Sequence, residues 1–312
     1  MTDTHSNTPL ASLRGVSKRY GKLVALDGID LAVHAGEVLA VLGPNGAGKS
    51  TAISALLGLS AVDSGQVQLF GRPPQELDAR RQIGVMLQSA GIPDAIKVGE
   101  LLELTRSYYA NPRSNAECVA LAGLEGLTGR RYGQLSGGQQ RRVQFALAVC
   151  GNPQLVFLDE PTTGLDIEAR QKLWEALHGL IAQGCAIVLT THYLEEAEAL
   201  ADRALVLNRG RVLAAGSMAE IRNLVAQRRI RCVSSLDAQQ VALWPQVRSA
   251  QRLQSRLEIV IEGAPEAVVR RLLVEDHALA ELEVQHGGLA EALVELTRND
   301  DDKCASRQQE AA

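Results

Sequence analysis

The chain has 312 residues, of which 46% are hydrophobic and 22% are charged, and its formal net charge is -4. This length allows one large domain and a smaller one, and the composition is typical of a soluble globular protein. No basic surplus of the kind found in nucleic-acid-binding proteins is present, so we expect no nucleic-acid partner.

The start of the chain, MTDTHSNTPLASLRG, does not read as a secretory signal, because no charged segment precedes an apolar one. Nowhere do about 18 apolar residues run together, the length that a membrane-spanning helix needs. The cysteines are scattered without a CxxC pair, which favours a reducing compartment. We therefore expect a chain that stays in the cytoplasm and does not itself span a membrane.

Four short apolar runs are each followed by polar residues. The run Val38–Leu42 leads into a glycine-rich loop, and the others are followed by Gln88, by Asp159 and Glu160, and by Thr190, Thr191 and His192. Runs that are apolar at every position are typical of strands buried on both faces of a parallel sheet. Ligands bind at the carboxyl ends of such strands, so the four segments are expected to converge on one site.

The glycine-rich loop indicates the ligand. Residues Gly43 to Ser50 match the pattern G-x-x-x-x-G-K-[ST], in which backbone N–H groups close around phosphate oxygens at a helix start. In this pattern Lys49 reaches the outer phosphates and the Ser50 hydroxyl binds Mg²⁺. The alternative interpretation is a glycine turn with a purely structural role.

The acidic pair Asp159 and Glu160 supplies complementary chemistry at the end of a predicted strand. One carboxylate can hold the metal, and the next can polarise an attacking water. The alternative is an aspartate that caps the following helix.

The stretch LSGGQQRRV, residues 135–143, contains two adjacent glycines at the start of a predicted helix. Glycine costs about 1 kcal/mol relative to alanine inside a helix, so something other than helix stability favours the pair. A loop followed by a solvated, charged helix start is the simpler interpretation of this stretch taken alone.

The motifs GPNGAGKST, Gln88, LSGGQQRR, LVFLDEPTTGLD and TTH stand in an order and spacing that resemble the ATP-binding cassette (ABC) ATPases, over about residues 10–216. The resemblance implies an α/β fold of the P-loop NTPase type, with a RecA-like core, an antiparallel β-subdomain and a helical subdomain over about residues 89–150. It also implies ATP and Mg²⁺ as cofactors and two copies of the chain in each ATP-bound dimer.

The resemblance also assigns site residues. It implies catalytic roles for Lys49, Glu160 and His192, and Mg²⁺ contacts for Ser50, Gln88 and Asp159. The residues of one copy that contact the nucleotide would be Tyr20, which stacks on adenine, with Gly43, Asn45, Gly46, Gly48, Lys49, Ser50, Thr51, Gln88, Asp159 and Asp166. The residues that reach the nucleotide of the other copy would be Ser136, Gly137, Gly138 and Gln139, which explains the glycine pair by a ligand.

The composition changes after about Ser217. Stretches such as RLEIVIEG and EAVVRRLLVE predict a small α+β appendage over residues 217–298, followed by a disordered tail over residues 299–312. The end of the appendage, LEVQHGGLAEALVELT, resembles that of the ATPase subunits that serve ABC-2 type exporters. An amphipathic closing helix of no special role is the alternative.

The resemblance implies an ATPase that energises export through a separate ABC-2 type membrane permease, at the cytoplasmic face of the inner membrane. An importer subunit would share every ATPase motif, so only the appendage favours export. A non-transport cassette acting on DNA or ribosomes is the other alternative. Such relatives carry long coiled coils or two cassettes in one chain, and this sequence shows neither feature.

Overall fold

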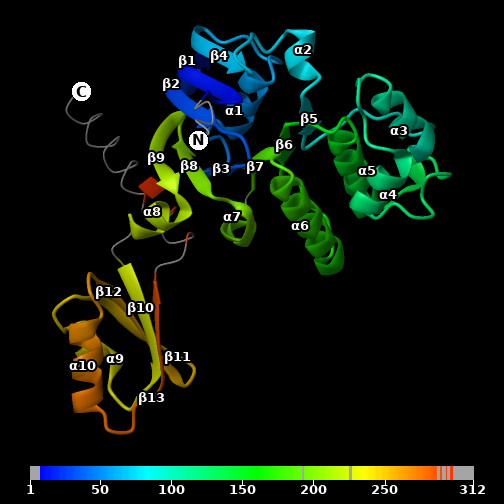
Figure 1. Cartoon of the computed structure of the whole chain (residues 1–312). Coiled ribbons are helices and arrows are strands. Elements are labelled where there is room, and N and C mark those ends of the chain that lie inside the picture. The colour runs from blue at the N-terminus through cyan, green and yellow to red at the C-terminus, as the bar shows by residue number, and fades with distance from the viewer. Residues whose placement is uncertain are drawn as a thin grey trace, which may run out of the picture. The chain divides into compact units, whose positions relative to one another are not determined.

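A computed structural model describes residues 8–191, 193–224 and 227–286, together with residues 289, 293, 296 and 297. The chain divides into two compact units, Met1–Gly216 and Ser217–Ala312. Figure 1 labels their helices and strands. The expected disordered tail, residues 299–312, lies outside the described residues.

The N-terminal unit is built on a six-stranded sheet with the strand order β5-β6-β7-β3-β8-β9. Neighbouring strands from β5 to β8 run parallel, which brings their carboxyl ends to one edge of the sheet. The strands are β3 (Val38–Leu42), β5 (Ile83–Met86), β6 (Leu155–Asp159), β7 (Ala186–Thr190), β8 (Arg203–Asn208) and β9 (Arg211–Ser217).

Both faces of this sheet are buried, as the continuous apolar runs predict. On β6, for example, Val156 and Leu158 pack into one hydrophobic core, while Leu155 and Phe157 pack into a second core on the opposite face. The helices that follow the central strands are α1 (Lys49–Leu56), α6 (Ile167–Ala182) and α7 (Leu194–Leu200). The sheet edge is thereby held rigidly at the point where the predicted site residues lie.

A second sheet of the N-terminal unit is antiparallel and has the strand order β2-β1-β4. Its strands are β1 (Ala11–Tyr20), β2 (Leu23–Val33) and β4 (Ser64–Leu69), and the short helix α2 (Leu77–Arg80) follows. Its apolar residues join α1 and one face of the six-stranded sheet in the second core. This sheet corresponds to the β-subdomain that the sequence predicts.

The segment of the chain between β5 and β6 is helical. They are α3 (Val98–Arg106), α4 (Asn115–Ala122), the short 3-10 helix η1 (Tyr132–Gln134) and α5 (Gly137–Val149). Their buried residues belong to the same hydrophobic core as Val156 and Leu158 of β6. In Figure 1 the green helices of this segment lie together, beyond the β5 end of the sheet.

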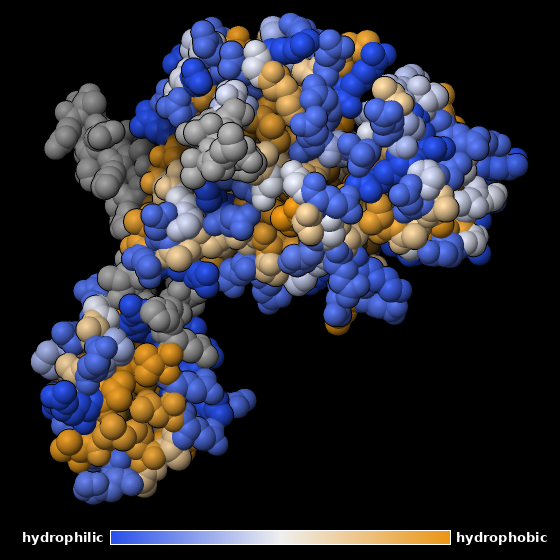
Figure 2. Space-filling view, viewed as in Figure 1, coloured by the Kyte–Doolittle hydropathy of each residue, from blue (hydrophilic) through white to orange (hydrophobic). Residues whose placement is uncertain are grey.

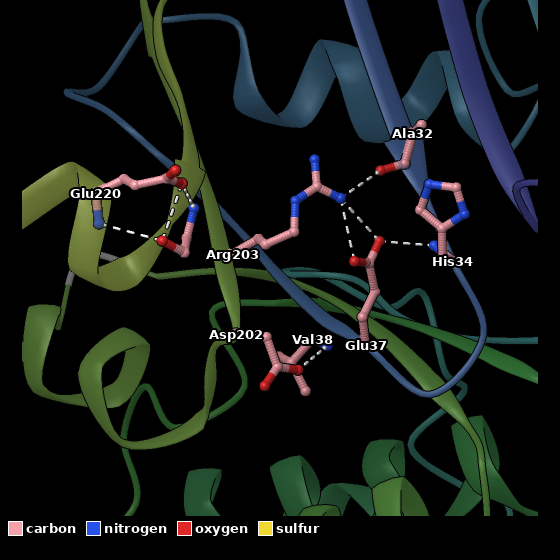
Figure 3. Close-up of polar contacts among 8 residues, drawn as sticks. Ala32, His34, Glu37, Val38, Asp202, Arg203 and Glu220 are labelled. Atoms are coloured by element: carbon pink, nitrogen blue, oxygen red, sulfur yellow. Dashed lines mark hydrogen bonds and ion pairs between the residues drawn. The ribbon is translucent and has the colours of Figure 1, made fainter. Parts of the chain in front are cut away.

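Polar contacts fix the start of β3 against β8 (Figure 3). The Val38 amide donates to Asp202 Oδ2 at 2.9 Å, and the Asp202 amide donates to the Val38 carbonyl at 3.0 Å. Beside them, Arg203 forms an ion pair with Glu37 at 3.1 Å, and Glu37 Oε1 accepts a hydrogen bond from the His34 amide at 2.6 Å. These bonds set the register of the strand that carries the glycine-rich loop.

The C-terminal unit has the split β-α-β order β10–α9–β11–β12–α10–β13, with a sheet order of β11-β12-β10-β13 and antiparallel pairing. It begins with the short helix α8 (Met218–Asn223). The other elements are β10 (Gln227–Val233), α9 (Ala238–Ala242), β11 (Val247–Leu253), β12 (Arg256–Glu262), α10 (Glu266–Glu275) and β13 (Ala280–His286).

One face of this smaller sheet packs against α9 and α10. Ile230, Leu257 and Ile259 on the strands meet Val241 and Leu272 on the helices in a hydrophobic core of their own. Figure 2 shows apolar surface in the area of these two helices. The α+β appendage that the sequence predicts is therefore observed, with its own core.

Among the residues that the structure describes, no helix is both long enough and apolar enough to cross a membrane.

Candidate functional site

The loop between β3 and α1 is enclosed so tightly that two of its positions accept only glycine. Gly43 has a φ of +144°, and a Cβ there would lie 2.1 Å from the Leu207 carbonyl oxygen. Gly48 has a φ of +107°, and a Cβ there would lie 2.6 Å from the Ala25 carbonyl oxygen. The backbone is thereby held around an open concavity at the start of α1.

Lys49 begins α1 and turns back over the loop. Its Nζ donates to the Gly43 carbonyl at 2.7 Å and to the Pro44 carbonyl at 3.0 Å. Burial lowers the pKa of Lys49, and the Glu160 and Asp159 carboxylates raise it. No side chain caps the helix at Gly48, so the amide groups of the first turn are available to an anion.

The acidic pair lies at the end of β6. Asp159 is buried, and its Oδ1 accepts a short hydrogen bond from the Thr190 hydroxyl at the end of β7. Glu160 has a φ of +50°, a left-handed conformation that only a few per cent of non-glycine residues adopt. Its Oε2 accepts hydrogen bonds from Gln88 Nε2 at 3.1 Å and from the Thr163 hydroxyl at 3.4 Å. Thr190, which the sequence analysis placed at a strand end without assigning it a role, is therefore a residue of the site.

A buried arginine of α5 holds the ends of β5 and β6. Arg141 is 7% exposed, and its guanidinium donates to the carbonyls of Leu87 at 2.8 Å, Asp159 at 2.6 Å and Glu160 at 2.6 Å. Burial lowers the pKa of Arg141, and the Asp159 and Glu160 carboxylates raise it. The sequence reasoning also missed Arg141, although it stands inside the LSGGQQRR motif.

A cleft of about 390 Å³ collects most of the predicted site residues. Its lining includes Tyr20, Asn45, Gly46, Gly48, Lys49, Ser50, Thr51, Gln88, Asp159 and Glu160. Gly43 lies beside it as the acceptor for Lys49. His192 lies outside the described residues.

Tyr20, at the end of β1, offers an aromatic face to this cleft. Its side chain is half exposed, and its hydroxyl lies 3.2 Å from Ser60 Oγ. Lys18 Nζ lies 5.2 Å from the centre of the ring. A ring that is anchored at its hydroxyl and open on a face can stack on a planar base.

The LSGGQ residues do not line this cleft. Ser136 is the N-cap of α5: its Oγ accepts from the Gln139 amide at 3.3 Å, and Gln139 Oε1 accepts from the Ser136 amide at 3.1 Å. A Cβ on Gly137 would meet nothing within 4 Å, whereas one on Gly138 would lie 3.2 Å from the Gly164 carbonyl oxygen. The helix start is thus formed and open.

Asp166 is likewise placed at a helix start and not in the cleft lining. Its Oδ1 accepts a hydrogen bond from the Ala169 amide at 2.7 Å and caps α6. The structure therefore shows a capping role for Asp166, and its contact with the nucleotide stays a prediction.

The residues of the cleft fit a nucleoside triphosphate with a divalent cation. The glycine backbone and the uncapped helix start suit phosphate oxygens, and Lys49 supplies a positive charge beside them. The Ser50 hydroxyl, the Gln88 amide oxygen and the Asp159 carboxylate are oxygen ligands of the type that Mg²⁺ prefers.

Comparisons with known proteins agree with this chemistry. A family model described as ABC transporter matches residues 26–163. The Nod factor export ATP-binding protein I of Rhizobium sp. (strain N33) is 43% identical over 212 residues, which cover 66% of this chain and 70% of that protein. The protein of the same name from Burkholderia orbicola (strain AU 1054) is 41% identical over 211 residues, which cover 65% of this chain and 69% of that protein.

Solved structures resemble a similar share of the chain. One described as the ATP binding subunit of an ABC transporter has a TM-score of 0.64 and 29% identity, covering 69% of this chain and 92% of the other. The cassette MJ0796, described as a dimeric post-hydrolysis state bound to ADP and Pi, has a TM-score of 0.61 and 28% identity, covering 66% and 98%. These matches confirm the cassette fold expected from the sequence.

We predict that Arg141→Lys lowers the rate of ATP hydrolysis by about 10- to 100-fold while the affinity for ATP stays within about two-fold. Lysine keeps the charge but loses the planar fork that spans three carbonyls, so Glu160 shifts, and a misplacement of about 1 Å can cost about 100-fold in rate. Steady-state ATPase assays and nucleotide titrations on the purified chain measure both quantities.

Arg142→Lys is the matched control, because Arg142 donates to the Gly123 carbonyl within the helical segment and not to the strand ends. It should keep the wild-type rate. A wild-type rate for Arg141→Lys would contradict the role given to Arg141.

Proposed function

We propose an export function for this chain, which belongs to the ABC transporter family and is an ATP-binding subunit that hydrolyses ATP. In this proposal the chain energises a separate ABC-2 type permease and lies at the cytoplasmic face of the inner membrane. The observation that carries the ATPase part of the proposal is the cleft in which the glycine loop, Gln88 and the acidic pair converge. Export is favoured because the two relatives described above are named for it.

Nucleotide binding in the cleft depends on the loop backbone and on Lys49. The amides of Gly46, Gly48 and the first turn of α1 would surround the β- and γ-phosphates. Lys49 Nζ would exchange its bonds to the Gly43 and Pro44 carbonyls for bonds to phosphate oxygens, which carry a full negative charge. The exposed face of Tyr20 would stack on the adenine.

A metal ion would be held by Ser50, Gln88 and Asp159, and when bound it would neutralise charge on the phosphate oxygens. Asp159 is prepared for this role because Thr190 holds one of its oxygens and Arg141 holds its backbone carbonyl. The carboxylate is therefore fixed in orientation before any ligand enters.

Glu160 is the group that would polarise the attacking water. Gln88 and Thr163 donate to one of its oxygens, and the backbone on either side is held by Arg141 and by the Thr190 carbonyl, which accepts from the Glu160 amide at 3.0 Å. A positioned general base contributes about 10²- to 10⁴-fold in rate. The strained conformation of Glu160 is consistent with this function.

A second copy of the chain would complete the site. Ser136, Gly137, Gly138 and Gln139 form an open helix start outside their own cleft, where an anion is favoured. We propose that this helix start contacts the γ-phosphate bound to the other copy, so that ATP lies between two chains. Closing and reopening of the pair would drive the permease between its access states.

We predict that Gly137→Asp abolishes ATP hydrolysis, lowering the rate by about 1,000-fold, while the chain still folds and binds ATP. The new carboxylate would face the partner's γ-phosphate, and like charges about 4 Å apart repel by about 4 kcal/mol at an effective dielectric constant of 20. We expect the variant to fold, because a Cβ at Gly137 meets no other atom within 4 Å and an acidic residue is favourable at a helix start. ATPase rates, ATP titrations and melting temperatures measure these effects.

Mixing two inactive variants distinguishes a site that is shared between two chains from a defect within one chain. Lys49→Ala should also be inactive alone, but a mixture with Gly137→Asp pairs an intact loop on one chain with an intact LSGGQ on the other and should show partial ATP-dependent dimerisation. Gly129→Asp, at an open position of the helical segment, is the control and should stay active. A Gly137→Asp chain with the wild-type rate would rule out the shared site.

The proposed transport function is tested by identifying the proteins that bind this chain. We expect the full-length tagged chain, purified from detergent-solubilised native membranes, to carry a protein with several apolar segments of about 20 residues each, identified by mass spectrometry. Reconstitution of the pair in vesicles should raise the ATPase rate above that of the chain alone. Purification with ribosomal or DNA-repair proteins, and no stimulation by a membrane protein, would contradict the proposal.

A further inference from the structure

A buried carboxyl group lies outside the set of residues used so far. Glu196, on α7, is fully buried, and neither of its carboxyl oxygens has a hydrogen-bond partner in the part of the chain that the structure describes. Three other unpartnered buried atoms come from residues that interact with it: Thr162 Oγ1, Trp174 Nε1 and Arg170 Nε. Unpaired polar atoms are thus concentrated at one place in the N-terminal unit.

Burying unpaired polar atoms together destabilises the folded chain, a cost that a residue with only a structural role would avoid. A buried polar group without a partner costs about 1–3 kcal/mol, and more if it is charged. Burial raises the pKa of Glu196, while the nearby Thr191 hydroxyl, Thr162 hydroxyl and Trp174 N–H lower it. Polar groups of these three residues therefore lie close to the Glu196 carboxyl and offset part of the cost of its burial.

Each donor belongs to a segment that carries a residue of the ATPase site. Thr162 follows Glu160 by two positions in the turn PTTG, and Thr191 directly follows β7, whose last residue, Thr190, bonds Asp159. Trp174 lies on α6, the helix that begins at the Asp166 cap. Glu196 thus lies where side chains of these three segments meet.

The segment after β7 is itself held in a tight turn. The Thr191 hydroxyl accepts from the Tyr193 amide at 2.9 Å and donates to the Tyr193 carbonyl at 3.3 Å. The Tyr193 ring in turn stacks with the Arg170 guanidinium at 5.0 Å, which ties the turn to α6. A rotation of the Thr191 hydroxyl hydrogen toward Glu196 would connect this turn to the carboxyl.

We propose that Glu196 is a positioning residue for ATP hydrolysis, which holds the turn after Glu160 and the segment after β7 in register through Thr162, Thr191 and Trp174. The proposal rests on the roles proposed above for Glu160 and Asp159. Glu196 touches no substrate; it acts through the donors that surround it. The two oxygens of a carboxylate can accept about four hydrogen bonds, so one such group can link three segments at one point.

Glu196→Gln is the test, because it keeps the shape but replaces one acceptor oxygen with an N–H₂ group that faces donors. We expect kcat to fall by about 10- to 100-fold, as a shift of about 1 Å at a catalytic group can cost about 100-fold. The KM for MgATP and the ATP affinity should stay within about two-fold of wild type, because the phosphate loop is not involved. Glu195→Gln, one residue away and exposed, is the matched control and should keep the wild-type kcat.

A double variant distinguishes positioning from general loss of structure. If Glu196 acts through Thr162, then Glu196→Gln combined with Thr162→Val should lower kcat no more than the more severe single variant does. Independent, multiplicative losses in kcat would overturn the proposal. So would a wild-type kcat for Glu196→Gln, or a parallel fall in kcat, ATP affinity and melting temperature.

The two proposals fail in different ways. A wild-type chain that hydrolyses ATP but is never stimulated by a membrane protein would remove the export proposal and leave the Glu196 test intact. A normal rate in Glu196→Gln, with transport demonstrated for the wild type, would remove only the positioning role.

Discussion

The buried guanidinium of Arg141 is the constraint on which the site depends. It comes from the helix that LSGGQ starts, and it binds carbonyls at the ends of two strands. Burying a charged group is costly unless it is fully hydrogen-bonded, so these strand ends cannot move away without exposing an unpaired cation in the interior. The helical segment, Gln88 and Glu160 therefore behave as one structural unit.

The parallel sheet brings the strand ends that Arg141 holds together with the glycine loop in one binding site. Strands β3, β5, β6 and β7 all end at the same edge, so a loop, an amide and two carboxylates from distant parts of the chain line one cleft. The LSGGQ helix start lies outside that lining although its helix carries Arg141. One helix therefore holds the ends of the strands that carry the residues proposed to be catalytic in its own chain and, in the proposed dimer, offers its first turn to the other chain.

The sequence predicted the strands and the cleft well, because these depend on local patterns. Continuous apolar runs marked the buried strands, and Val38–Leu42 is observed with those bounds, while the run before Gln88 forms the strand Ile83–Met86, which leaves Leu87 outside it. Arg141 and Glu196 could not be predicted in this way. Each stands in a polar or acidic stretch that reads as a solvated helix face, and only the tertiary packing buries it.

The most direct measurement is a structure of the wild-type chain bound to Mg²⁺ and a non-hydrolysable ATP analogue. The triphosphate should lie on the loop after β3, with Lys49 Nζ bonded to phosphate oxygens instead of the Gly43 and Pro44 carbonyls. Arg141 should keep its bonds to the Asp159 and Glu160 carbonyls, and LSGGQ of a second chain should contact the γ-phosphate. A nucleotide bound outside this cleft, or an Arg141 detached from the strand ends, would contradict the central claim.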